Sequence, residues 1–169
     1  MVQPSQGLAV HPETGELPWM AVPIQATLVS IRTAFVTGAP FSKERERLWD
    51  AFMLWDRLVQ ELLPNARVYL DGSFLCHRQD VAPDDIDVFV IADPSDYRRL
   101  SHEEKKQIFN ATLLYGLRKY KPFDVVDANY CDSTNQHLVA YWAELWSRVR
   151  LKDGRFHDSA RKGYVEVLR

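Results

Sequence analysis

The sequence has little cysteine, no long apolar run and no excess of charge of one sign. It contains two cysteines in 169 residues, and 21 basic side chains stand against 23 acidic ones, for a net charge of −2. Two cysteines without a CxxC spacing indicate neither a disulfide framework nor a zinc site, and they fit the ordinary thiols of a reducing compartment. A near-neutral charge excludes a global basic field, so any contact with nucleic acid must come from a local patch.

Targeting and membrane signals are also missing. The first residues have neither the basic segment nor the apolar core of a signal peptide, and no run approaches the roughly 20 apolar residues of a membrane span. We therefore expect a cytoplasmic protein with no membrane partner. Four of the nine prolines fall in the first 23 residues, so we expect an extended arm over 1–23 and a single domain over 24–169.

Apolar periodicity predicts an α/β (α+β) domain with a small sheet. Ser101 to Glu104 has the pattern of a capping box and indicates a helix start. The expected helices cover 27–36, 42–63, 101–119 and 135–149, and the expected strands cover 67–71, 85–92, 123–129 and 163–168.

The residues most suggestive of chemistry follow the first of these strands. That strand runs into Gly72-Ser73, and the next one carries Asp85 and Asp87 one residue apart. Alternate residues of a strand point to one face, so the two carboxylates should project together. A divalent cation such as Mg²⁺ relieves their repulsion, and the N–H groups and hydroxyl of a Gly-Ser turn suit phosphate oxygens. The pattern predicts a site for metal and phosphate.

Nucleotidyl transfer uses two metal ions about 3.5–4 Å apart, which two carboxylates alone hold poorly. A third acid should come from the strand expected at 123–129. Asp124 has the same apolar-Asp-apolar setting as Asp87 and is preferred. Asp127 lies at the opposite parity along that strand and is the alternative.

A cluster of basic residues near the C-terminus is interleaved with the aromatic residues Trp146, Phe156 and Tyr164. This mixture fits contact with a nucleotide or with nucleic acid, although a solvated surface is the simpler reading. Lys162 is the preferred single contact because it precedes a glycine at the start of the last strand. The cluster consists of Arg148, Arg150, Lys152, Arg155, Arg161 and Lys162.

Gly72-Ser73 followed by Asp85-Ile86-Asp87 resembles the signature of the DNA polymerase beta-like nucleotidyltransferases, with Asp124 matching their later third acid. Leu17-Pro18 and Lys162-Gly163 are among further pieces that resemble a small family of nucleotidyltransferase-like proteins of bacteria and their phages, mostly of unassigned function. The resemblance covers most of the chain. It implies a small mixed sheet flanked by helices.

The resemblance also implies an activity, the Mg²⁺-dependent transfer of NMP from an NTP such as ATP to a hydroxyl. Gly72 and Ser73 would hold the terminal phosphates, Asp85 and Asp87 would ligate two Mg²⁺ or Mn²⁺ ions, and Asp124 would ligate the catalytic metal and help activate the hydroxyl. An RNA 3′ end, a protein side chain and a small molecule all stay open as acceptors. A role as a toxin or in phage conflict is in keeping with the family.

Two other functions remain open. The first is an inactive nucleotidyltransferase fold that binds nucleotide or a partner protein, or acts as an oligomer, in an antitoxin-like or regulatory role. It gains weight because no large second domain for the acceptor is evident in the sequence. The second is a metal-dependent phosphodiesterase, since the same acids can position water.

Overall fold

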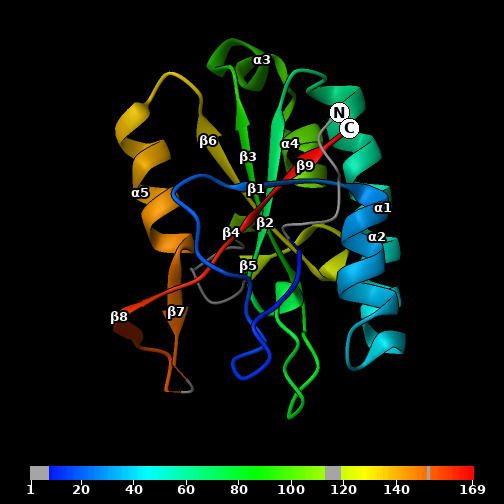
Figure 1. Cartoon of the computed structure of the whole chain (residues 1–169). Helices are drawn as coiled ribbons and strands as arrows, with labels where there is room; N and C mark the ends of the chain where they lie inside the picture. Colours follow the sequence, from blue (N-terminus) through cyan, green and yellow to red (C-terminus); the bar gives the residue numbers. More distant parts are fainter. Residues whose placement is uncertain (1–7, 113–118, 152) are drawn as a thin grey trace, which may run out of the picture.

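The computed structural model describes residues 8–112, 119–151 and 153–169. Its centre is a five-stranded mixed sheet in the order β1-β9-β2-β3-β6 (Figure 1). Two parallel pairs, β1 with β9 and β3 with β6, are joined through antiparallel pairing of β2 with both β9 and β3. These strands are β1 (Ile24–Thr27), β2 (Arg67–Asp71), β3 (Ile86–Ala92), β6 (Val126–Asp132) and β9 (Val165–Leu168).

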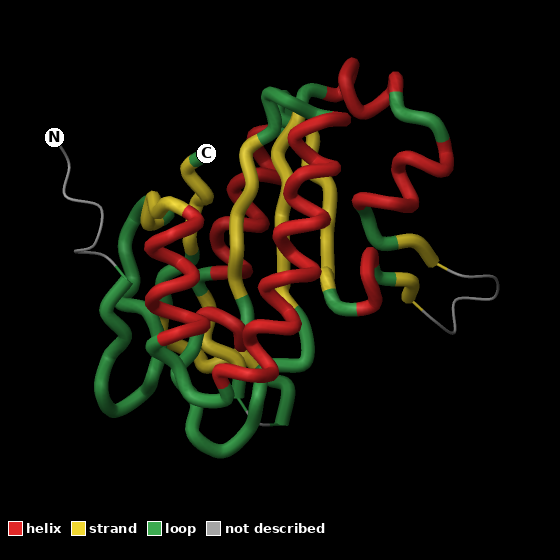
Figure 2. The backbone as a smooth tube through the Cα atoms, turned by 90° about the vertical axis from the view of Figure 1, so that its right-hand side faces the viewer, coloured by secondary structure: helices red, strands yellow, loops and turns green. Residues whose placement is uncertain are grey.

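Helices lie on both sides of this sheet, which confirms the predicted α+β class. Helix α5 stands on one side and α1 and α2 on the other (Figure 1), and the view of Figure 2 places helices in front of the strands. No helix of the described residues is long and apolar enough to cross a membrane. The helices are α1 (Leu28–Arg32), continued by a π-helical turn (Thr33–Thr37), α2 (Ser42–Leu62), α3 (Pro94–Arg99), α4 (His102–Ile108) and α5 (Gln136–Trp146).

The two faces of the sheet carry different side chains because successive strand residues point to opposite sides. Leu70 and Val88 belong to a large apolar core that includes the buried α2 residue Phe52. Tyr69 and Phe89 belong to a smaller aromatic cluster with Trp146 of α5. Asp71 and Asp87 share the parity of Tyr69 and Phe89, and the two acids are paired across β2 and β3. The strands therefore direct their acids to the α5 face.

The helix expected over 101–119 is shorter than predicted. The Ser101–Glu104 capping box is present, but the helix ends at Ile108. The Trp55 indole donates a 2.8 Å hydrogen bond to the Ile108 carbonyl, so a tertiary contact takes an acceptor from the last helical turn. Beyond it lie β4 (Ala111–Thr112) and β5 (Lys119–Tyr120), and the intervening residues of the predicted helix, 113–118, fall outside the described residues.

Parts of the segment 8–23 contact the rest of the domain. Leu8 and Leu17 are buried. The Gly15 carbonyl accepts a 2.7 Å hydrogen bond from the His77 N–H, and the Leu17 carbonyl accepts one of 3.0 Å from the Gly163 N–H. The described part of the predicted arm thus braces the loop after Ser73 and the entry to β9. The rest of that arm, 1–7, lies outside the described residues.

Candidate active site

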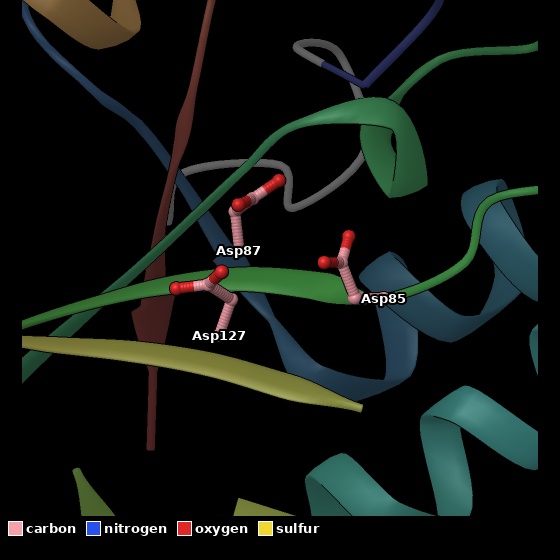
Figure 3. A group of neighbouring side chains, drawn as sticks. All are labelled: Asp85, Asp87 and Asp127. Atoms are coloured by element: carbon pink, nitrogen blue, oxygen red, sulfur yellow. The ribbon is translucent and has the colours of Figure 1, made fainter. Parts of the chain in front are cut away.

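Three carboxylates converge at one end of the α5 face. Asp85 immediately precedes β3, Asp87 lies within it, and Asp127 of the neighbouring β6 is in parallel register with Asp87. Each offers an oxygen within 4.8 Å of the others, and Figure 3 shows the side chains projecting from the two strands. Carboxylate oxygens gathered in this way are the ligand set that hard divalent cations take. The cluster can therefore hold a metal ion.

Asp127, and not the preferred Asp124, supplies the third carboxylate of this cluster. Asp124 is exposed and ends a short 3-10 turn (Pro122–Asp124), where its φ is 63°. The strand was expected from residue 123 but begins at Val126. The apolar-Asp-apolar setting of Asp124 arose from Phe123, which is 42% exposed in the same turn. Phe123 belongs to this turn and not to β6, so its apolar character did not mark a strand position.

The pKa of the Asp87 carboxyl is well above its ordinary range. Burial, followed by the charges of the nearby acids Asp85, Asp71 and Asp127, raises its pKa to about 7 against the opposing charge of Lys121. Both causes disfavour the ionised form. A cation in the cluster would relieve the repulsion.

Lys121 is the basic side chain that contacts this cluster. Its ammonium pairs with Oδ2 of Asp85 and lies 3.1 Å from Oδ2 of Asp127. Burial lowers the pKa of Lys121, but its hydrogen bonds and the charges of the two acids outweigh that cost, so the pKa is raised. The sequence does not indicate this contact, since Lys121 lies in the loop after β5 and is 36 residues from Asp85 along the chain.

Asn110 positions the third acid. Its amide nitrogen donates to Asp127 Oδ1 at 2.8 Å, and its amide oxygen accepts from the Ala128 N–H at 3.1 Å. Asn129 donates to the same Asp127 oxygen at 3.3 Å. These bonds fix one carboxylate oxygen and leave the other directed at Lys121. This role of Asn110 was not predicted, because the residue falls within the helix expected over 101–119.

The Gly-Ser turn fits against the acids with no room for a side chain. Gly72 has a φ of 79°, and a Cβ at this position would overlap the Asp87 carboxylate. The Gly72 N–H donates a hydrogen bond to the Asp71 carboxylate. Because Gly72 has no side chain, the Asp87 carboxylate can lie directly against the turn. Ser73 follows at the start of a 3-10 turn (Ser73–Leu75), and its hydroxyl makes no hydrogen bond to a described residue.

A buried arginine of α2 holds this turn in place. Arg45 donates to the Phe74 carbonyl at 2.6 Å and to the Cys76 carbonyl at 2.5 Å. Further bonds tie it to the carbonyls of Phe35 and Pro40. Burial lowers the pKa of the guanidinium. The sequence does not indicate this role, because Arg45 lies among the buried and mostly apolar residues of α2.

The acids and the turn line a pocket of about 550 Å³ that also has a basic wall. That wall belongs to the hairpin of β7 (Arg148–Arg150) and β8 (Phe156–Arg161). The guanidinium carbons of Arg148 and Arg150 lie 5.8 Å and 5.5 Å from the centre of the Phe156 ring. Part of the basic cluster noted in the sequence therefore faces the acids.

Arg148 pairs with Glu144 through its Nε at 3.2 Å, whereas Arg150 forms no ion pair with a described residue. The other described members of that basic cluster are engaged by acids. Lys162 lines the pocket, but it is buried and its ammonium pairs with Asp71. Arg155 pairs with Asp153, and Arg161 pairs with Glu144. Lys152 lies outside the described residues. The preferred phosphate contact, Lys162, is thus already engaged by a carboxylate.

A second pocket, of about 1030 Å³, occupies the same face of the sheet. Its walls are largely apolar and aromatic, including Tyr69, Phe89 and Trp142, and Trp146 lines both pockets. Glu166 is its half-buried acid. Tyr69 and Gln25 each donate to it at 3.3 Å, and it forms no ion pair with a described residue. One sheet face thus combines an acidic end with an apolar hollow.

Fold and site together define an α+β protein with a carboxylate cluster in a pocket that basic side chains also line. The family model described as "Family of unknown function (DUF6932)" matches residues 10–168, and the chain belongs to this family. Comparisons with curated proteins and with solved structures gave no match.

Proposed function

We propose that the protein is a metal-dependent nucleotidyltransferase of the DNA polymerase beta-like type, which moves NMP from an NTP to a hydroxyl acceptor. The observation that supports this most is the convergence of Asp85, Asp87 and Asp127 beside Gly72-Ser73. Neither feature is distinctive alone. Together they bring a hard-cation site and a phosphate-sized space into one pocket.

The residues present fit a divalent ion, since they are three acids with a raised pKa at Asp87. Asp85, Asp87 and Asp127 would hold Mg²⁺, with two ions expected and Mn²⁺ able to replace them. When bound, such ions neutralise phosphate charge and make an acceptor hydroxyl more acidic. Asp127 takes over the role that the resemblance assigned to Asp124.

The basic wall and the serine would bind the triphosphate. Arg148 and Arg150 present guanidinium groups that match phosphate oxygens, and the Ser73 hydroxyl is available as a donor. In the reaction a bond forms between the acceptor oxygen and the α-phosphorus. The bond between the α-phosphorus and the oxygen that bridges it to the β-phosphorus breaks. Pyrophosphate leaves, and Asp127 takes the acceptor proton.

The apolar pocket gives the acceptor a place on this proposal. It lies on the sheet face that carries the acids, and Trp146 lines both pockets. Its volume is that of pockets for small organic ligands. The aromatic walls and Glu166 favour an acceptor with an apolar ring and a hydrogen-bond donor, on a small molecule or on the side chain of a partner.

Label transfer tests the activity. The wild-type protein, Asp87→Ala and Asp84→Ala are each incubated with every α-labelled NTP and Mg²⁺ in a cell extract. Asp84 is an exposed acid of the same segment outside the cluster, so it is a matched control. We expect labelled product from the wild type and Asp84→Ala only. Equal labelling by all three proteins, or by none, rejects the transferase.

An inactive binding module is the second candidate, and the pairing of Lys121 with the acids favours it. An ammonium in the cluster already neutralises part of the charge that a metal would balance. Calorimetry separates the two functions. Nucleotide that binds equally with and without Mg²⁺, with no product formed, supports the binding module.

A further inference from the structure

Lys121 reaches the acid cluster from outside the two strands that carry it. It follows β5 and leads into the turn before β6, while Asp85 immediately precedes β3 and Asp127 lies on β6. Its ammonium contacts one oxygen of each of these acids. The lysine thus bridges two carboxylates, as a metal ion in the cluster would.

The oxygens that Lys121 contacts are those available for a cation. Asp127 Oδ1 is held by Asn110 and Asn129, whereas Oδ2 faces the ammonium. On Asp85 the ammonium also takes Oδ2. A divalent ion and an ammonium cannot share these oxygens, since two positive charges about 4 Å apart repel strongly in a partly buried site.

The Lys121 side chain is able to move away from Asp85 and Asp127. Its side chain is 25% exposed and lines the same pocket as Ser73, Arg148 and Arg150. A lysine stem is flexible, and its compact charge binds phosphate as well as carboxylate. Once displaced from the acids, its ammonium would bind the phosphates of a nucleotide in that pocket.

We propose that Lys121 is a resident counter-ion of the acid cluster, and that binding of the divalent ion transfers its ammonium from Asp85 and Asp127 to the nucleotide phosphates. This inference rests on the proposed function for the existence of the metal site. It predicts how metal binding depends on nucleotide binding. Metal alone competes with Lys121 and binds weakly, whereas nucleotide provides the displaced lysine with a new partner. By linkage, metal and nucleotide then strengthen each other's binding.

Titration of the metal-free protein with Mn²⁺ tests this inference without any need for activity. The variants are Lys121→Met, Lys121→Arg and the control Lys43→Met, an exposed lysine at the start of α2. Without nucleotide, Lys121→Met should bind Mn²⁺ at least about fivefold more tightly than the wild type, the lower end of common coupling factors. Lys121→Arg and Lys43→Met should bind it much as the wild type does.

The second arm uses a non-hydrolysable ATP analogue at saturating Mn²⁺. Lys121→Met should bind it at least about fivefold more weakly, again the size of an ordinary coupling. Unchanged or weaker Mn²⁺ binding by Lys121→Met overturns the counter-ion role, and unchanged analogue binding overturns the transfer to phosphate. If no protein binds Mn²⁺, the metal site itself is wrong and the inference falls with it. Circular dichroism checks that each variant is folded.

Discussion

The two faces of the central sheet differ in almost every physical respect, although the same strands build both. Toward α2 the strands present aliphatic residues such as Leu70 and Val88, and the interface is fully buried. Toward α5 the alternate residues form an aromatic cluster that gives way to Asp71 and Asp87. One face stabilises the fold and the other is hollowed by two pockets. Parity along a strand therefore decides whether a residue serves stability or chemistry.

The largest expected effect lies on the α2 face. Phe52 is 0% exposed, and Phe52→Ala should lower the free energy of unfolding by about 3–5 kcal/mol, the usual cost of such a cavity. Chemical denaturation measures it. Leu54→Ala on the same helix, at 52% exposure, should change it by less than about 0.5 kcal/mol. Mn²⁺ affinity of folded Phe52→Ala should equal that of the wild type; a large loss would mean that the two faces are not separable.

Gly72→Ala should do the reverse on the α5 face. Its Cβ would overlap the Asp87 carboxylate at a positive φ, so the acid must move. A shift of about 1 Å at a reacting group costs about 100-fold in rate. Label transfer should therefore fall by that factor or more, with Mn²⁺ affinity falling too. Wild-type activity in this variant would show that Asp87 is not held against the turn. Gly154→Ala, at a positive φ with open space around it, controls for backbone strain.

The pH dependence of stability should sharpen the contrast. In the folded protein, burial and the neighbouring acids raise the pKa of Asp87 to about 7, above its ordinary value of 3.8. The folded state therefore holds its proton more tightly, and this group makes the free energy of unfolding fall as pH rises from about 4 to 7. Metal-free wild type should lose about 2 kcal/mol relative to Asp87→Asn across that window, allowing for relaxation of the site. Parallel curves for the two proteins would contradict the account.

The smallest effect should come from a residue that only positions an acid. Asn110→Ala removes the donor that fixes Asp127 Oδ1. Loss of such a partner usually costs 10–100-fold in metal affinity, and we expect about tenfold because Asn129 still donates to that oxygen. Mn²⁺ titration measures it. An unchanged affinity would remove Asn110 from the site.

Local pattern was a good guide wherever the signal was short-range. The strands predicted over 67–71 and 85–92, the helix predicted over 42–63 and the Ser101 capping box all matched the structure closely, because each depends on neighbours along the chain. The strand β1 was missed since four residues carry little periodicity and are fixed by pairing with the distant β9. The hairpin of β7 and β8 was missed for a different reason, because β7 overlaps the helix predicted over 135–149 and β8 is mostly polar without apolar alternation.

The candidate site divides in the same way. Gly72, Asp85 and Asp87 could be identified because turn and strand set their geometry locally. Asp124 was preferred over Asp127 because the start of β6 is fixed by pairing with β3, which the sequence does not display. Lys121, Asn110 and Arg45 act across long sequence separations, so no spacing rule could have found them.

The choice between the two candidate third acids tests the central claim most directly. Asp127→Ala and Asp124→Ala remove acids that are close in sequence, only one of which belongs to the cluster. Incubation with α-labelled NTP and Mg²⁺ should give no labelled product with Asp127→Ala and wild-type labelling with Asp124→Ala. Full labelling by Asp127→Ala, or its loss in Asp124→Ala alone, would contradict the site described above.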